Sequence, residues 1–598
     1  MRARSVVSRR LAYDPTTRYP CFGAATFGSA IFTANADFRA AIFTANADFR
    51  AATFHSTTEF ESAAFQRTAW LVAVTFQSDA WLGDAAFQRD AGFFRATFQS
   101  HAGFQSVTFR GDAKFGWATF KGHARFGSAT FQHDADFGSA AFQREAQFGS
   151  ATFAGRAQFE SVTFAGASFP AATFQGYAGI RAATFAGAAW FELAAFERAA
   201  EFKSAVFRQG VGFGAAAFQQ DAWFEKAIFE QTATFGPLTC AGTVVVSGAV
   251  FRGPVTLLFA ARRLECQRAR WSSTAELRLR YAAVDFGHAL FEYPLTISAE
   301  PAPFVHPTRG PVAEQDLAGT PDAGVRLMSL QGVDAAHLVL TDVDLAECLF
   351  ARTVHLDQIR LEGLCTFAGT PPGTHWRRWR IVRFTPRRTL AEEHHWRASQ
   401  PSTFPGWSTS GSDVVHVGPP QLALVYRALR KALEDGKDEP GAADFYYGEM
   451  EMRRHDRVRT SRAERGLLHG YWLLSGYGLR ASRALGWLAA MMFITVVLLM
   501  GFGLPKGDPQ QEATGTVPRG GGKVTFVIGR DDPQNPSKNK FTGQRFEKAL
   551  NVTLNSVVFR SSDQDLTTSG TYIEMTSRLS EPILLGLAAM AVRNRVKR

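Results

Sequence analysis

The densest group of metal-binding side-chain types in this chain is the run EEHH at 392–395, with His375 nearby in the sequence. Carboxylate and imidazole groups bind zinc in proteins when their donor atoms converge on one point. Side chains of adjacent residues rarely converge in this way. We therefore expect Glu392, Glu393, His394 and His395 to lie on a solvated loop or helix, and we expect no metal site.

Other reactive residue types show no catalytic arrangement. The sequence contains no nucleophile–base pattern, no phosphate-binding loop and no dinucleotide fingerprint. The five cysteines form no CxxC pair, and their odd number argues against a disulfide framework. The chain is therefore expected to be no enzyme and to hold no cofactor.

Positive charge lies in two restricted segments. The chain has a net charge of +11, yet residues 20–250 hold 16 Lys/Arg and 18 Asp/Glu, a net of −2. One basic segment, HWRRWRIVRFTPRR (375–388), mixes Arg with Trp and could contact anionic lipid or nucleic acid, or form a basic edge strand that caps a neighbouring fold. The other, 453–483, has eight Arg against two acidic residues.

Phe recurs at alternating spacings of five and six residues from Phe27 to Phe235. Of the 39 positions that fit this pattern, 36 are Phe, and the residue two before each is Ala in 34 cases. The alternation is broken once, by three successive spacings of five from Phe159 to Phe174, where we expect a kink or a tightened corner. A short fixed period over this length predicts a solenoid, in which each unit buries its apolar face against its neighbours.

The pair two residues apart has the period of an extended strand, so Ala and Phe point to the same side and the residue between them points outward. The polar or small residues after each Phe suit a turn. Four such units would close one coil of about 22 residues with Phe inside. An 11-residue helical repeat is the competing interpretation, but it would place successive Phe on different helix faces. The predicted core includes Phe98, Phe104, Phe109, Phe115, Phe120, Phe126, Phe131 and Phe137.

These tandem A-x-F-x-x units resemble the pentapeptide-repeat family in a Phe-rich variant, and the resemblance implies a right-handed, four-sided β-helix. A second patch at 328–367 is closer to the usual form of that family. There Leu330, Ala335, Leu340, Leu345 and Phe350 are five residues apart, and the register then slips by one to Leu356 and Leu361. Cys348 falls at an inward position of this patch.

The remaining segments complete the predicted domain organisation. We expect an N-terminal tail at 1–20 and a β-helix at 21–370, regular at 25–237 and irregular at 238–327, with a Pro-rich excursion loop at 300–325. A basic segment and linker occupy 371–420. From 421 to 483 the apolar period becomes helical, which predicts a hairpin of two helices and then a short interfacial helix. This hairpin resembles one found in some bacterial membrane-bound pentapeptide-repeat proteins.

Residues 484–598 are expected to be a transmembrane region. The segment 485–504 has 20 residues without a charge, enough to cross a bilayer, and a buried helix of a soluble fold is the alternative. The preceding arginines place its N-terminal side in the cytoplasm. An external loop would follow at about 505–570. Residues 571–592 could span a second time if they accommodate Glu574, Arg578 and Glu581, and RNRVKR would return the C-terminus to the cytoplasm.

The layout of two spans around residues 546–560 also resembles a two-helix channel unit. A potassium-type filter needs glycines that let successive carbonyls face the pore. After Arg560 this chain has Ser561, Ser562 and Asp563, with Gly570 the first glycine. The resemblance is therefore to a degenerate channel-like region.

These observations predict a non-enzymatic, membrane-anchored pentapeptide-repeat scaffold for protein–protein interaction, located at the cell membrane with the β-helix and both termini cytoplasmic. Its partners would be the lipid bilayer and a protein, with nucleic acid not expected. Trp is costly to expose without a partner, so Trp70, Trp81, Trp190 and Trp223 are candidate contacts. The alternatives are a channel-like protein with the β-helix as regulatory domain, and a DNA-mimic inhibitor of a topoisomerase, an activity of some family members.

Overall fold

The protein divides into two compact units, residues 1–417 and 418–598. The structure is a computed structural model that describes residues 12–13, 20–317, 319, 323–377, 380–401, 404–409, 417–506, 511–515, 520–521, 523–524, 526–530, 533–558, 560 and 564–596. Most of the predicted tail at 1–20 and much of the predicted linker at 400–420 lie outside these residues. The first unit is mainly β and the second is mainly helical.

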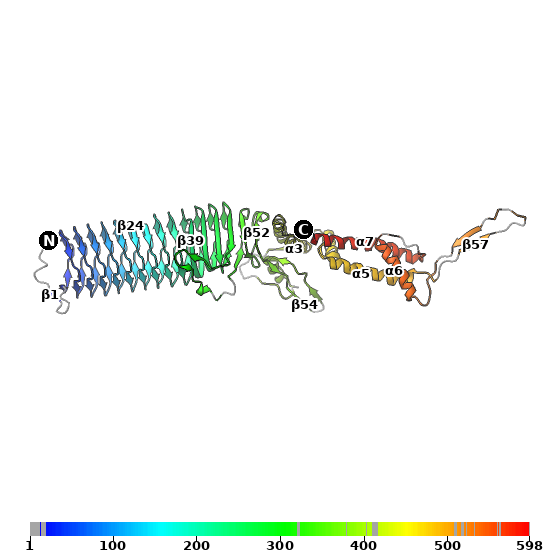
Figure 1. Cartoon of the computed structure of the whole chain (residues 1–598), viewed down its shortest axis with the longest axis horizontal. Helices are drawn as coiled ribbons and strands as arrows, with labels where there is room; N and C mark the ends of the chain where they lie inside the picture. The colour runs from blue at the N-terminus through cyan, green and yellow to red at the C-terminus, as the bar shows by residue number, and fades with distance from the viewer. Residues whose placement is uncertain are drawn as a thin grey trace. The chain divides into compact units, whose positions relative to one another are not determined.

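The first unit is a β-solenoid of about 15 turns, which confirms the predicted fold at this level and excludes the helical repeat. In the regular part, each turn contributes four short strands. Strands β8 (Thr53–Phe54), β9 (Thr58–Glu59), β10 (Ala64–Phe65) and β11 (Ala69–Trp70) pair in parallel with the strands of the next turn, β12 to β15. Phe54 lies opposite Phe76 in this pairing, so the coil length predicted from the Phe period is correct. Figure 1 shows these short stacked strands in blue to cyan.

The single irregularity in the Phe period is absorbed at one corner. Strand β24 (Ala141–Gln147) pairs with β27 (Thr163–Ser168) with a register shift between Phe142 and Glu145. The ring stack continues across this turn, with centroids 5.0 Å apart for Phe142 and Phe164 and 4.7 Å apart for Phe148 and Phe169. The missing residue thus shortens a corner and leaves the core undisturbed.

Beyond Phe235 the solenoid changes form without ending. Long strands β39 (Thr234–Val245) and β41 (Val255–Glu265) run through corners that are turns elsewhere. The coil becomes shorter than in the regular part, since Phe251 pairs with Trp271 and Trp271 with Phe291. The indole of Trp271 stacks on the Phe251 ring at 4.1 Å. The irregular part is therefore a continuation with shorter coils.

The Pro-rich excursion folds back onto the solenoid. It forms the hairpin β47 (Val305–His306) and β48 (Gly310–Pro311) and a 3-10 turn, Gln315–Leu317. Phe304 and Leu317 bury themselves against Ala260. A buried ion pair between Arg280 and Glu314, 2.8 Å from Nε to Oε1, fastens the excursion.

The second repeat patch closes the solenoid as predicted. Leu330, Ala335, Leu340, Leu345 and Phe350 are all buried, and so is the Cys348 thiol. The predicted slip in register is confirmed, since Leu340 pairs with Leu361 in β52 (Arg360–Glu362).

The second unit begins with two packed helices, α2 (Pro419–Asp435) and α3 (Glu439–His455), at the predicted hairpin. Helix α4 (Arg462–Ser475) leads through a left-handed Gly476 to α5 (Ala481–Leu498), which continues as a π-helical turn, Leu499–Gly503. Helices α6 (Gly543–Val557) and α7 (Thr568–Val596) complete the unit, and α7 packs on both α5 and α6. Strands β57 (Gln511–Gly515) and β58 (Phe526–Arg530) form an antiparallel pair within the predicted external loop, which the sequence does not indicate.

Within the described residues, one helix is long and apolar enough to cross a membrane, Ala481–Gly503, and one such helix is weak evidence by itself. Helix α7, the predicted second span, does not meet the same criterion of composition.

Candidate functional site

The predicted core residues are inaccessible from outside. All eight, Phe98 to Phe137, are fully buried. Rings one full turn apart lie parallel, as Phe104 and Phe126 do at 4.7 Å and 5°, and rings half a turn apart meet edge to face, as Phe115 and Phe126 do at 5.5 Å and 89°. Both arrangements are favourable for aromatic quadrupoles. These residues hold the solenoid together, and any interaction must use the outward positions.

The outward positions form two kinds of column along the solenoid. In one kind the residue between Ala and Phe is small or β-branched and uncharged over many turns. The column on β12 and its in-register neighbours contains Thr53, Thr75, Thr97, Thr119, Ala141, Thr163, Thr184, Val206, Ile228 and Val250. In the other kind, charged residues and Trp alternate with Gly, as in Trp70, Gly92 and Lys114.

Charges in the second kind of column pair with charges at the corners, both within a turn and between turns. Lys203 lies 3.1 Å from Glu201 and 3.6 Å from Glu225, and Arg181 bridges Glu160 and Glu201. Such exposed pairs contribute little to stability, but they neutralise the surface. No strongly acidic or basic face results from them.

The four candidate Trp side chains occupy outward positions of these columns. Trp190 is 44% exposed, while the other three are half-buried. The indole of Trp81 lies over Gly103, and that of Trp190 lies over Gly212, where a Cβ would come within 2.6 Å of the ring. A Gly in the next turn therefore makes room for the Trp, which lies along the surface instead of projecting from it. This cover reduces the cost of exposing the indole.

Trp117 is not among the candidates predicted from the sequence, yet it is 60% exposed. It lies at a corner, two residues after Phe115, in a left-handed conformation with φ of 59°. Phe94, 38% exposed, is at the corner one turn earlier, against Gly116, and the Arg95 guanidinium lies 5.4 Å from its ring centroid. The sequence places both residues in the turn that follows an inward Phe. The Phe period predicts that turn but does not predict how exposed its side chains are.

That corner position has a property common to the whole solenoid. Nineteen residues from Ser29 to Lys226, spaced by 11 with one spacing of 10, have positive φ and none is Gly. At most of these corners the amide that follows donates to the carbonyl of the preceding inward Phe or Leu, as Ala129 does to Phe126 at 3.1 Å. A positive φ at the third residue of such a turn is the type II pattern. None of the nineteen is β-branched, because Val, Ile and Thr tolerate this conformation least.

The EEHH run lies on helix α1 (Ala391–Ala398), but our prediction that it is solvated is wrong. Glu392, Glu393 and His394 are buried against the last turns of the solenoid. The Glu392 Oε1 accepts hydrogen bonds from the amides of Phe350 and Ala351, the latter at 2.9 Å. Burial raises the pKa of Glu392 to about 7, against the opposing effect of these amides.

The neighbouring acid and histidine have structural partners as well. Glu393 receives Arg387 and Arg397, each at 2.6 Å. His394 shares a hydrogen bond with the Thr389 hydroxyl at 2.9 Å, and burial lowers the pKa of its imidazole. Among the residues that the structure describes, no group of three or more His, Cys, Asp or Glu is arranged to hold a metal. The run therefore docks α1 on the end of the solenoid.

The basic segment after the solenoid does not form an edge strand of it. Strands β54 (Thr374–Arg377) and β55 (Arg380–Arg383) pair with each other in a separate two-stranded sheet. The alternative that this segment caps the solenoid is therefore wrong, and α1 takes that place. Contact of the segment with lipid or nucleic acid stays a prediction.

In the second unit, α3, α4 and α5 meet around Trp472. Its indole lies between Arg454, 4.4 Å from the ring centroid, and Arg483, 5.1 Å from it, and its Nε1 donates to the Tyr447 hydroxyl at 3.1 Å. The buried Tyr477 hydroxyl donates to Glu451, which also pairs with Arg454. Cation–π contacts and a buried hydrogen bond thus join the hairpin to the apolar helix.

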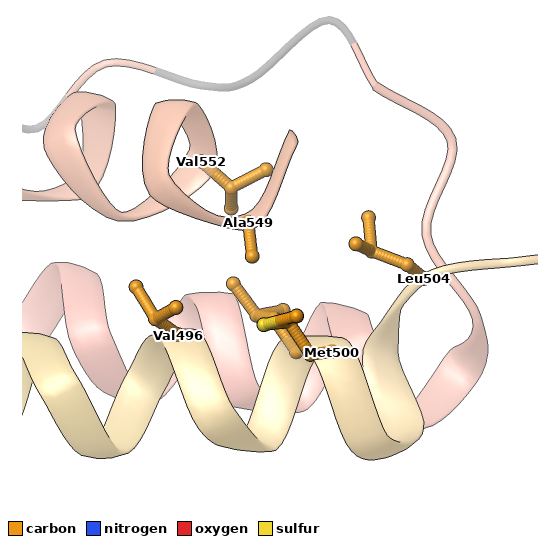
Figure 2. Close-up of a cluster of buried hydrophobic side chains, with 6 residues drawn as sticks. Val496, Met500, Leu504, Ala549 and Val552 are labelled. Atoms are coloured by element: carbon orange, nitrogen blue, oxygen red, sulfur yellow. The ribbon is translucent and has the colours of Figure 1, made fainter. Parts of the chain in front are cut away.

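Helix α6 packs against the end of α5 through Ala549 and Val552, which contact Val496 and Met500 (Figure 2). Arg545 at the start of α6 donates to the carbonyls of Met500, Leu504 and Pro505, which lie at the end of the π-helical turn. Leu504 and Pro505 directly follow this turn, so the guanidinium caps the C-terminal end of the helix. The backbones of Gly503 and Gly570 touch, and a Cβ on Gly570 would lie 2.3 Å from the Gly503 oxygen.

Helix α7 buries several polar side chains and exposes large apolar ones, the opposite of a helix on the surface of a soluble protein. Its buried stripe contains Gly570, Glu574, Ser577, Glu581, Leu584, Ala588 and Ala591, and its exposed large residues are Tyr572, Met575, Leu579, Ile583, Leu585, Met590 and Val592. Glu574 pairs with Arg578 at 2.7 Å, and Glu581 lies 3.0 Å from the Thr495 hydroxyl of α5. Glu574, Arg578 and Glu581, the three charged residues that a second span would have to accommodate, therefore have partners inside the unit.

Comparison with known proteins bears on the solenoid alone. A family model described as pentapeptide repeats, in nine copies, matches residues 93–141 and 191–237. Both matched segments lie in the regular part, so the solenoid carries pentapeptide repeats. Neither a curated protein nor a solved structure matches the chain.

Proposed function

We propose that this chain is a non-enzymatic, membrane-anchored scaffold whose pentapeptide-repeat solenoid, a right-handed, four-sided β-helix, presents surfaces for protein–protein interaction in the cytoplasm. The observation that carries the proposal is the inverted sorting of α5 and α7. Phe493 of α5 is 70% exposed and Tyr572 of α7 is 68% exposed, whereas the carboxylates of α7 face inward. Large apolar side chains facing out along two packed helices suit lipid better than water.

The charge distribution supports an orientation for this anchor. Eight Arg lie at 453–483, before α5 and in its first turn, and RNRVKR occupies 593–598. Basic residues near span ends favour the cytoplasmic side. Both termini and the solenoid would then be cytoplasmic, with the loop between α5 and α7 outside.

Membrane anchoring is tested by fractionation of cells that express the full chain. We expect it to stay in the membrane fraction after alkaline carbonate washing and to be released by detergent. Release by carbonate alone would reject the anchor.

Topology is tested with single cysteines on a background without the five native ones. A cysteine at Ser537 should react with a membrane-impermeant reagent in intact cells, and one at Asp435 should react only after lysis. Reaction of the Asp435 cysteine in intact cells would contradict the orientation.

The interaction surface is tested by photo-crosslinking. A photoreactive amino acid in place of Trp117 or Trp190, the two most exposed Trp of the solenoid, should yield a crosslinked protein in cells. The same group in place of Arg125, an exposed residue of an uninterrupted stretch, is the matched control. Equal yields from all three positions would reject these Trp as contacts.

A channel-like function is the second candidate, favoured by the short helix α6 packed between two longer helices. The predicted filter positions Ser561, Ser562 and Asp563 lie outside the described residues. We expect no potassium-selective current from the reconstituted chain, because this segment lacks the glycines that such a filter requires. A selective current, lost on changing Thr553, would make the solenoid a regulatory domain. The DNA-mimic alternative finds no support in the paired, near-neutral surface of the solenoid.

A further inference from the structure

Glu581 of α7 contacts Thr495 of α5 where the two helices pack. Its side chain is fully buried, and its partner Thr495 is buried too. Thr495 lies three residues from the middle of the apolar helix Ala481–Gly503. Burying an ionised carboxyl at this depth in a helical unit costs free energy, and such buried ionisable residues are often functional.

The hydrogen bonds around Thr495 indicate the state of this carboxyl. The Thr495 Oγ1 lies 3.0 Å from the Met491 carbonyl and 3.0 Å from the Glu581 Oε1. A hydroxyl has one hydrogen, and a carbonyl can only accept. Both contacts are full hydrogen bonds at once only if the Glu581 carboxyl is the donor in the second, and so carries a proton.

The other oxygen of the carboxyl points to the same state. Glu581 Oε2 is buried and has no hydrogen-bond partner among the described residues. In an ionised carboxylate this unsatisfied oxygen would share the negative charge. In a neutral carboxyl it is a carbonyl oxygen, whose burial costs much less free energy.

Charged groups on the packed elements have other partners. On α7, Arg578 is paired with Glu574. On α5 the only charged residue is Arg483, which donates to the Trp472 carbonyl, and on α6 Arg545 is bound to carbonyls. The remaining charged or titratable side chains described on α7 and on the helices that touch it are Tyr572 and Arg593 on α7; Glu547 and Lys548 on α6; Glu439, Asp444, Tyr446, Tyr447, Glu449, Glu451, Arg453, Arg454 and His455 on α3; and Arg462, Glu464, Arg465, His469 and Tyr471 on α4. None of them forms an ion pair with Glu581 within the described residues.

We propose that Glu581 is a proton-binding site inside the helical unit, neutral when α5 and α7 are packed, and that loss of its proton loosens this contact. The proton passes to water when the carboxyl ionises, and the Thr495 hydroxyl then donates to the carboxylate. The next residue, Pro582, has no amide hydrogen, so the helix lacks one stabilising bond beside this site. The position of the site within a bilayer rests on the proposed membrane anchor, but its protonation does not.

Infrared spectroscopy of the purified full-length protein in lipid vesicles at neutral pH tests the proposal. The carbonyl band of a protonated carboxyl should be present and should lose a component in Glu581→Gln. The matched control is Glu574→Gln, which removes an arginine-paired carboxylate of the same stripe and should leave the band unchanged. A Glu392→Gln background removes the contribution of a second buried carboxyl, whose hydrogen bonds come from backbone amides and whose pKa is raised by burial. An identical band with and without Glu581 would overturn the proposal.

A second variant guards against misfolding of Glu581→Gln. Thr495→Val keeps the carboxyl but removes its acceptor, so the band should change position without losing intensity. Hydrogen exchange of α7 amides in the wild type should accelerate at alkaline pH beyond base catalysis, and in Glu581→Gln it should not. Equal exchange in both would overturn the coupling to packing. These spectra are measured equally well in detergent micelles, whereas carbonate extraction tests the anchor, so the two proposals fail separately.

Discussion

Between Phe38 and Phe229 the solenoid places apolar rings and methyl groups inside and its charged side chains at outward positions, where several pair from turn to turn, as Lys203 and Glu225 do. In helix α7 of the second unit, Glu574 and Glu581 are inside while Met575 and Leu579 are outside. The solenoid and helix α7 therefore bury opposite kinds of side chain. This contrast is what the proposed anchor requires: water around the solenoid, and lipid around the outer faces of α5 and α7.

The largest expected effect comes from the solenoid core. Phe126→Ala removes a ring that stacks on Phe104 and Phe148, and it should cost about 3–5 kcal/mol, from lost burial plus the cavity left behind. Arg125→Ala, at the adjacent exposed position, should cost under about 0.5 kcal/mol. Chemical denaturation of the full-length protein, followed by hydrogen exchange of the 98–153 strands, measures both. Equal effects of the two variants would show that the stack does not carry the stability.

The next prediction tests the inversion directly by adding a charge to an outward position in each unit. Phe493→Asp on α5 should reduce membrane insertion by about 2.5–3.5 kcal/mol, the cost of Asp near the centre of a spanning helix. Thr119→Asp, at an outward position of the solenoid, should change stability by less than about 1 kcal/mol. Insertion is measured from the fraction of chain that resists carbonate extraction. If Phe493→Asp inserts like the wild type, the outer face of α5 does not contact lipid.

Sequence reasoning was most successful where one rule is repeated many times. The Phe and Ala positions determined the inward face and the coil length, because strand geometry leaves one choice for residues two apart. It failed for Glu392, because four polar residues in a row give no sign that a helix will bury them against Phe350 and Ala351, far earlier in the sequence. It also failed for Trp117, since the period says nothing of which corners carry large side chains. For α7 the composition gave an uncertain span, and only packing shows that its charges face inward.

A third prediction compares the buried carboxyl of Glu392, at the end of the solenoid, with the side-chain amide of the Glu392→Gln variant. The pKa of Glu392 is raised by burial from its ordinary value of 4.5 to about 7. The folded state therefore binds this proton more tightly than the unfolded state, and the stability that it contributes is fully present below pH 4.5 and is lost as the pH rises through 7.

The size of this effect is on the order of 1–3 kcal/mol, and Glu392→Gln should remove it, because the amide oxygen can accept from the same two backbone amides. The measurement is hydrogen exchange of the 330–367 strands between pH 5 and 8, corrected for the pH dependence of exchange itself. Glu347→Gln, at another carboxylate of the same repeat patch, is the control and should keep the wild-type slope. A slope that survives in Glu392→Gln would assign the pH dependence to another group.

The smallest expected effect concerns the corners that distinguish the solenoid from the helices. Ser128 has a φ of 56°, a conformation that a non-Gly residue adopts at a cost of about 1 kcal/mol. Ser128→Gly removes this strain but adds freedom to the unfolded chain, so the two effects should nearly cancel, with a change within about 0.5 kcal/mol. Ser128→Val should destabilise by about 1–2 kcal/mol, because a β-branched residue tolerates positive φ least.

The matched control is His133, at the neighbouring corner without positive φ, where glycine brings only the entropic loss and should cost about 0.5–1 kcal/mol. Thermal denaturation of the full-length variants should rank Ser128→Gly above His133→Gly, and His133→Gly above Ser128→Val. If the two glycine variants are equally destabilised, the left-handed corner carries no strain, and the absence of β-branched residues from all nineteen corners needs another cause.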